Sequence, residues 1–161
     1  MPILPYDRAA AARYAVRWAL ARNPVYPDFT HLGGDCTNFI SQCLHAGAPR
    51  MNFTPDTGWY YRSLADRAPA WSGVLFLHRF LLRPAASPGP AARESELSAL
   101  LPGDVVLLHN GSRLYHAVLV LTPGADPLVA AHTDDALYRP LSSYEAARTI
   151  PLHISGVHPS P

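Results

Sequence analysis

The period of the hydrophobic pattern changes once along this chain, and that change limits the folds available to it. Up to about residue 83, apolar residues recur three and four positions apart, the spacing of one helix face. From residue 104 onward they form short strand-like runs separated by turn residues. Helices that precede strands in this way predict the α+β class, with N-terminal helices packed on a C-terminal antiparallel β-sheet. The length of 161 residues suits one domain, which we expect to span residues 1–161.

Two of the three expected helices carry no evident chemistry. The first follows Asp7, whose side chain can cap it, and extends over about residues 8–23 until Pro24 stops it. A later helix over about residues 73–83 can be capped by Ser72. Both present an apolar face, so we expect them to pack on the core.

Four strands are expected in the C-terminal half. They cover residues 104–109, 114–121, 128–132 and 150–157. Asn110-Gly111 is a hairpin turn signal between the first two of them. The segments 48–70 and 84–92 lack either period, and we expect them to be irregular and a surface loop, respectively.

Composition excludes several classes of function. The formal net charge is +1, so we expect no nucleic-acid partner. No segment approaches the roughly 18 apolar residues of a membrane span, and the N-terminus lacks the pattern of a signal peptide. All thirteen basic residues are arginine, which rules out a lysine nucleophile. Compartment remains open between the cytoplasm and a domain cut from a secreted precursor, and the oligomeric state is also open.

Both cysteines lie in the remaining helix, which starts near Cys36 and reaches Gly47 as its natural C′ residue. Two helical turns separate Cys36 from Cys43 by about 10 Å, too far for a disulfide. The apolar stripe of this helix contains Cys36, Phe39, Ile40, Cys43 and Leu44. Cys43 therefore reads as a core residue, whereas Cys36 lies in the first turn, behind the flexible Gly33-Gly34 loop.

The position of Cys36 is typical of a nucleophile. Free N–H groups and the helix dipole stabilise a thiolate at a helix N-terminus, and the N–H of Cys36 can form part of an oxyanion hole. The neighbouring Asp35 opposes this by raising the pKa of the thiol. A general base is therefore needed, and His116 is the candidate. It lies on the strand 114–121 and shares a face with Val118 and Val120, where its imidazole needs a partner such as a thiol at the helix–sheet interface.

A third residue should orient the imidazole of the base. His132 on the next strand is the first choice, Asp134 is its competitor, and Asp135 is a weaker one. A metal site built from His109, His116 and His132 is the alternative, but the sequence shows no ligand spacing that supports it. We therefore expect no metal and no cofactor.

A family resemblance strengthens this interpretation. The run Asp35-Cys36-Thr37-Asn38-Phe39-Ile40-Ser41-Gln42 resembles the nucleophile motif of the putative amidase domain family, a relative of the NlpC-type and CHAP-type cysteine peptidases of the papain-like clan. The resemblance also covers Tyr6-Asp7-Arg8, Trp59-Tyr60-Tyr61, Trp71-Ser72, Pro102-Gly103-Asp104-Val105, the His116 strand and His132-Thr133-x-Asp135. It implies a papain-like fold, a catalytic triad with Cys36 as nucleophile, His116 as general base and acid, and a polar third residue for which His132 fits. Such relatives are often bacterial thiol proteases.

The resemblance also has one departure. Papain-like peptidases place a glutamine shortly before the cysteine to complete the oxyanion hole, and none precedes Cys36 here. Thr30, His31 or the side chain of Asn38 can substitute, and the sequence does not choose among them. The implied function is hydrolysis of amide bonds in peptide or peptidoglycan-type substrates. The alternatives are a catalytically inactive binding module on the same fold and a thiol acyltransferase or transglutaminase.

Overall fold

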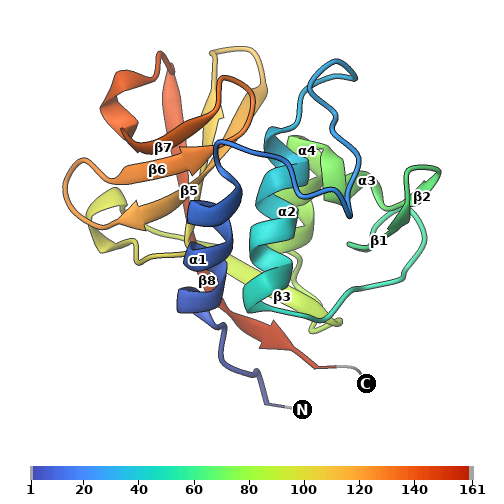
Figure 1. The fold of residues 1–161 in the computed structure, drawn as a ribbon. Coiled ribbons are helices and arrows are strands. Elements are labelled where there is room, and N and C mark those ends of the chain that lie inside the picture. Colours follow the sequence, from blue (N-terminus) through green and yellow to red (C-terminus); the bar gives the residue numbers. More distant parts are fainter. Residues whose placement is uncertain (1, 160–161) are drawn as a thin grey trace.

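A computed structural model describes residues 2–159 of the chain (Figure 1). The helices are α1 (Arg8–Trp18), α2 (Cys36–Gly47), α3 (Pro69–Ser72) and α4 (Val74–Leu81). A small hairpin comprises β1 (Tyr61–Ser63) and β2 (Asp66–Arg67). The main sheet comprises β3 (Gly89–Glu94), β4 (Val105–His109), β5 (Leu114–Thr122), β6 (Leu128–Ala131), β7 (Ala136–Pro140) and β8 (Arg148–His158). Its strand order is β3-β8-β4-β5-β6-β7 and every neighbouring pair is antiparallel, which confirms the α+β class.

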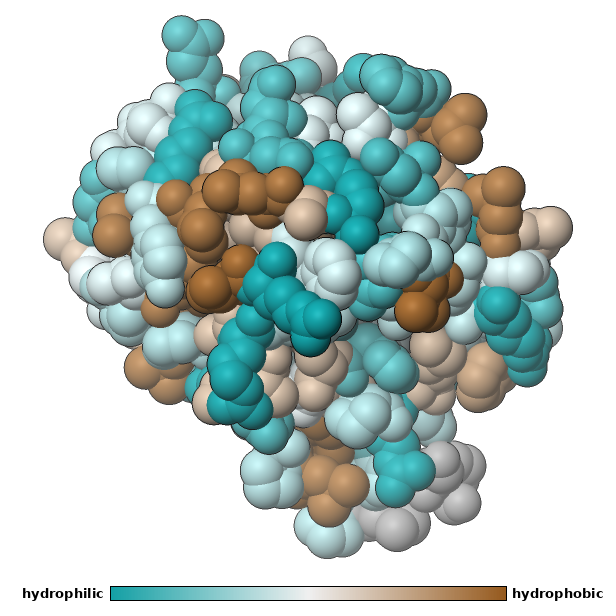
Figure 2. Space-filling view, viewed as in Figure 1, coloured by the Kyte–Doolittle hydropathy of each residue, from teal (hydrophilic) through white to brown (hydrophobic). Residues whose placement is uncertain are grey.

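The sheet separates two hydrophobic clusters. On one face, apolar residues of α1, α2 and α4 pack against alternate residues of β4, β5 and β8 (Figure 1). On the other face a smaller cluster lies under the short 3₁₀ helices Leu97–Ala99 and Leu141–Ser143. On the side of the molecule seen in Figure 2, hydrophobic residues form small separate groups among hydrophilic ones. Within residues 2–159, none of the helices has the length and hydrophobicity that crossing a bilayer requires.

Helix α1 begins as expected and ends early. Asp7 caps it through a 2.9 Å hydrogen bond from the N–H of Ala10. It ends at Trp18 and not near residue 23, because the carbonyl oxygen of Trp18 accepts from Ala21 in a tighter turn and contacts the ring of His132. After this turn the chain continues as the loop that leads to α2.

Helix α2 confirms the expected bounds but assigns Gly47 a different role. Gly47 is the last helical residue, and Ala48 is the C-cap. A Cβ on Gly47 would lie 2.5 Å from the carbonyl oxygen of Asp7 and 2.6 Å from the ring of Tyr6. Glycine is therefore required by close approach of the segment before α1, and not by a left-handed C′ conformation.

The remaining differences concern short elements. Ser72 ends α3 and accepts a hydrogen bond from Arg67 instead of capping a helix; the following helix, α4, starts at Val74 without a side-chain cap. The prediction that residues 84–92 form a surface loop is wrong from Gly89 onward, where strand β3 begins. Its proline is tolerated because β3 is an edge strand. The sequence also missed β1, β2 and β7, whose two to five residues are too few to display a period.

Candidate active site

Cys36 is the first residue of α2, reached through Gly33 and Gly34, which have φ angles of 97° and 101°. Its side chain is partly buried, and both cysteines are free thiols, as the spacing predicted. The Cys36 sulfur lies 3.7 Å from the hydroxyl oxygen of Thr37. The backbone N–H of Ala117, the residue directly after His116, lies near enough to lower the pKa of this thiol. The helix start and the β5 strand therefore meet at this sulfur.

The surroundings of the thiol keep it protonated in the free protein. Burial is the largest influence and raises the pKa of Cys36, and the charge of Asp35 acts in the same direction. Hydrogen bonds from Thr37 and from the N–H of Ala117 lower the pKa but do not outweigh burial. The unliganded thiol is thus not a preformed thiolate, and a base must accept its proton during any attack.

His116 lies on β5 with only 6% of its surface exposed. As the alternation predicts, Val118 and Val120 belong to the cluster on the far face of the sheet, whereas Ala117 packs on the helix side. The imidazole accordingly lies 5.5 Å from the ring of Tyr144 and not in the helix–sheet interface. Among the described residues, no hydrogen bond joins it to Cys36. The two residues are connected through the backbone of Ala117.

The imidazole of His116 is neutral at physiological pH. Burial, and after it the positive charge of Arg139, lower its pKa to about 4, although the charge of Asp134 acts in the opposite direction. A neutral imidazole can accept a proton, which is the state that a general base requires. The ring lines a hollow of about 510 Å³ together with Asn110, Tyr115, Thr133, Asp134, Arg139, Tyr144 and Glu145.

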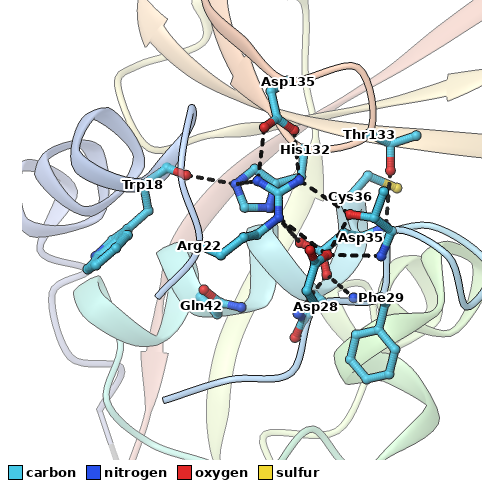
Figure 3. Close-up of polar contacts among 12 residues, drawn as sticks. Trp18, Arg22, Asp28, Phe29, Asp35, Cys36, Gln42, His132, Thr133 and Asp135 are labelled. Carbon is cyan, nitrogen blue, oxygen red and sulfur yellow. Dashed lines mark hydrogen bonds and ion pairs between the residues drawn. The ribbon is translucent and has the colours of Figure 1, made fainter. Parts of the chain in front are cut away.

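Asp35, directly before the cysteine, is almost completely buried, and both of its carboxylate oxygens and its backbone N–H have hydrogen-bond partners (Figure 3). Its Oδ1 accepts from the N–H of Phe29 at 2.8 Å and from the amide of Asn38 at 2.9 Å. Its Oδ2 lies 2.5 Å from Nδ1 of His132. Its backbone N–H donates to the hydroxyl of Thr133 at 3.0 Å. These bonds attach the start of α2 to the turn between β6 and β7.

Arg22 links the same region from a second direction (Figure 3). Its guanidinium pairs with both carboxylate oxygens of Asp135, at 2.9 and 3.0 Å. It also lies 3.3 Å from Asp28 and 3.7 Å from Asp35. The hydrogen bond that Arg22 donates to Asp135 is the largest of several influences that raise the pKa of Arg22, so the guanidinium stays charged. Arg22 thereby joins the loop after α1 to the β6–β7 turn.

The candidates for the residue that orients the His116 imidazole lie in two different places: the hydrogen-bond network around Asp35 and Arg22, and the hollow beside His116. Both ring nitrogens of His132 are engaged: Nδ1 by Asp35, and Nε2 by the Trp18 carbonyl oxygen at 2.7 Å. Asp135 binds Arg22. Asp134, with a left-handed φ of 54°, lines the hollow beside His116. Of these residues, the structure brings only Asp134 to the imidazole.

The oxyanion-hole candidates are also constrained. Both amide hydrogens of Asn38 are used, by Asp35 and by the carbonyl oxygen of Pro27. The hydroxyl of Thr30 donates to Asp28, and His31 is exposed. The unpaired first-turn N–H groups of α2, which begins at Cys36, are then the remaining candidates for an oxyanion hole.

The expected absence of a metal rests on spacing alone, and the structure adds one observation. Within residues 2–159, no three histidine, cysteine or acidic side chains are grouped as metal ligands would be. Nδ1 of His109, for example, accepts from the backbone N–H of Gly111 in its own turn.

Sequence reasoning missed the structural role of Asp35 and the whole role of Arg22. The sequence indicates Asp35 only as a charge beside the thiol, and it gives no sign that Arg22 belongs to the site. The one available signal was His132-Thr133-x-Asp135, whose three named residues all bond to this network.

Comparison with known proteins assigns the chain to a family, and that family is the one that the sequence motifs resemble. The chain is 34% identical over 140 residues to the uncharacterized protein YhbB of Bacillus subtilis (strain 168); the match covers 83% of this chain and 43% of that protein. The chain thus spans less than half the length of this relative. No solved structure matches the chain significantly. The sequence profile of the putative amidase domain matches residues 5–155, nearly the whole chain. The chain therefore belongs to the putative amidase domain family, whose description indicates an enzyme that acts on amide bonds.

Proposed function

We propose that this chain is a cysteine-dependent amide hydrolase of papain-like architecture, related to the NlpC-type and CHAP-type peptidases. Peptide or peptidoglycan-type amides are its proposed substrates. The observation that carries the proposal is the packing of α2, which begins at Cys36, against β5, which carries His116. It brings a thiol at a helix N-terminus to the residue that follows a neutral, buried histidine.

In the proposed reaction, the imidazole of His116 turns toward Cys36 when substrate binds. The Cys36 sulfur then attacks the amide carbonyl carbon while its proton passes to His116. First-turn N–H groups of α2 stabilise the negative oxygen that forms. The imidazolium then protonates the leaving nitrogen, the C–N bond breaks, and a thioester remains on Cys36. Water attacks this thioester and gives a proton to His116, which returns it to the departing sulfur; the acid is released.

The pKa values favour this concerted form of attack. The raised pKa of Cys36 and the pKa of about 4 for His116 leave thiol and imidazole neutral near pH 7. Proton transfer therefore accompanies bond formation and does not precede it. Asp134 is the proposed third residue, because it lines the same hollow and its charge favours the imidazolium. His132 remains the alternative suggested by the resemblance, although its nitrogens are engaged elsewhere.

The test is release of new amino groups from peptidoglycan fragments and from a panel of peptide aryl amides. Cys36→Ala should abolish turnover while the fold persists, and His116→Gln should slow it by about 10²- to 10⁴-fold. Cys43→Ala is the matched control, since Cys43 is a buried core thiol. Full activity of Cys36→Ala on any accepted substrate would disprove the mechanism.

One observation favours a second function, a binding module without turnover. The raised pKa of Cys36 means that the free protein has no activated thiolate. Such a module would bind fragments of these substrates with equal affinity in wild type and Cys36→Ala, and neither protein would release an amine. An acyltransferase would instead join the acyl group to an added amine, and mass spectrometry of the products distinguishes that outcome.

A further inference from the structure

The hollow beside His116 contains groups that the proposed reaction does not use. These groups are Arg139 and Tyr144, which stack on each other, and Glu145; Asp134, the proposed third residue, lines the same hollow. We propose that Arg139 and Tyr144 form a recognition site for a carboxylate carried by the substrate close to its scissile amide. This rests on the proposed function, since it names the substrate class of the same site.

The guanidinium of Arg139 is held in place without an acidic partner. Its Nε donates to the hydroxyl of Ser143 at 2.7 Å, and one terminal nitrogen donates to the Ser143 carbonyl at 3.2 Å. Its plane lies over the ring of Tyr144, with 3.7 Å between Cζ and the ring centroid. No carboxylate within the described part of the chain forms an ion pair with it. The other terminal nitrogen keeps its donors for a ligand.

Arg22 shows how this chain satisfies an arginine that has a structural role. That guanidinium binds both oxygens of Asp135 and lies near Asp28. Arg139, in contrast, is oriented by a neutral hydroxyl and a carbonyl and faces an open hollow. A guanidinium group that is held in place and has unused N–H donors is suited to bind a carboxylate through two hydrogen bonds.

Tyr144 supplies a second unused donor. Its hydroxyl oxygen is buried, and no group within residues 2–159 accepts its hydrogen. A buried hydroxyl that lost its water without gaining a partner is unfavourable, so an acceptor from a ligand would remove that cost. Because the Tyr144 ring lies 5.5 Å from the ring of His116, a bound carboxylate would lie next to the general base.

Charge in the hollow argues for a substrate with a small, specific anion and not for a polyanion. The carboxylates of Asp134 and Glu145 line the same space and repel negative charge, so an anion is favoured only next to the stacked Arg139 and Tyr144. A terminal carboxylate of a peptide and an acidic side chain both present this chemistry. A neutral amide of the same size does not.

The proposal is tested by binding, without using the thiol. Three probes are titrated into the protein: N-acetylglycine, N-acetylglutamic acid α-amide and the neutral N-acetylglycinamide. The readout is the NMR shift of the His116 ring signals, assigned with His116→Gln. We expect binding by at least one carboxylate probe with a dissociation constant on the order of 1 mM, and none by the neutral amide. The first probe reports a terminal carboxylate and the second an acidic side chain.

Variants separate the two donors from general charge effects. Arg139→Gln should weaken carboxylate binding by about tenfold or more, and Tyr144→Phe by less, whereas Arg139→Lys should retain part of the affinity. Arg93→Gln, on the exposed edge strand β3 at the opposite end of the sheet, removes the same charge and should change nothing.

Two results overturn the proposal: equal binding of the neutral amide, or unchanged carboxylate binding in Arg139→Gln. Failure of the proposed hydrolase function would appear elsewhere, as absence of turnover or its persistence in Cys36→Ala.

Discussion

Asp35 Oδ2 lies 2.5 Å from Nδ1 of His132, and both side chains are about 1% exposed. The pair joins the residue before Cys36, the proposed nucleophile, to the end of β6, so it helps to fix where Cys36 lies relative to the sheet. A buried pair of this kind is costly to break, because the remaining partner is left without compensation.

We therefore expect Asp35→Asn and His132→Gln each to lower the free energy of unfolding by about 3–5 kcal/mol. The double variant should cost clearly less than the sum, and urea denaturation of the four proteins measures the difference. Asp66→Asn is the control: its ion pair with Arg62 is exposed and contributes at most about 1 kcal/mol. Additive losses in the double variant would show that the pair is not coupled.

The proposed mechanism makes a prediction about pH. His116 must be neutral to accept a proton, so the acid limb of kcat/KM should have its midpoint near pH 4. Arg139→Gln should move this midpoint upward, because Arg139 lowers the pKa of His116. Asp134→Asn should move it downward, because Asp134 raises that pKa. Shifts in the opposite directions would contradict the proposed arrangement of charges.

Alkylation gives an independent reading of the thiol. Burial raises the pKa of Cys36 above its ordinary value, so the rate of iodoacetamide labelling should keep rising above pH 9.0. Asp35→Asn removes a charge that raises this pKa, and labelling should then begin at lower pH. Mass spectrometry resolves Cys36 from Cys43, whose buried thiol should stay unlabelled in the native protein. Rapid labelling of Cys36 at pH 7 would instead indicate a preformed thiolate.

The buried histidine also connects stability to pH. In the unfolded chain His116 takes up a proton below its ordinary pKa of 6.5, whereas in the folded protein it does so only near 4. Its stabilising contribution is therefore complete above pH 6.5 and is lost as the pH falls toward 4. The loss is on the order of 3 kcal/mol. His116→Gln should flatten the curve of unfolding free energy between these pH values, which denaturation at several pH values measures.

Close packing behind α2 gives a further prediction. Gly47→Ala places a Cβ 2.5 Å from the carbonyl oxygen of Asp7, so α2 or the start of α1 must shift. We expect a loss of about 1–3 kcal/mol in unfolding free energy. Ala46→Ser, at the preceding and less buried position, is a control for altering this turn of the helix. An unchanged midpoint of thermal unfolding in Gly47→Ala would show that the contact relaxes freely.

Some of the fold was accessible from the linear pattern. The 3.6-residue stripe placed Cys36 at the start of α2, and the alternation on β5 assigned His116, Val118 and Val120 to one face. Short elements such as β7 were missed because five residues, partly exposed, carry no clear period. Of the candidate site, the sequence indicated Cys36 and His116 as residue types, but whether they form a catalytic pair stays a prediction.

What the sequence determined is the local order: helices α1, α2 and α4, four of the six strands of the main sheet, and a cysteine at a helix start followed by a histidine on a strand. What only the tertiary structure decided is which polar groups become partners. Asp35 meets His132 across 97 residues, and Arg22 meets Asp135 across 113. Periodicity reports which face of an element is buried, because burial of apolar surface repeats with the backbone geometry. It contains no information on which loops converge, because that depends on how the helices and the sheet pack against one another.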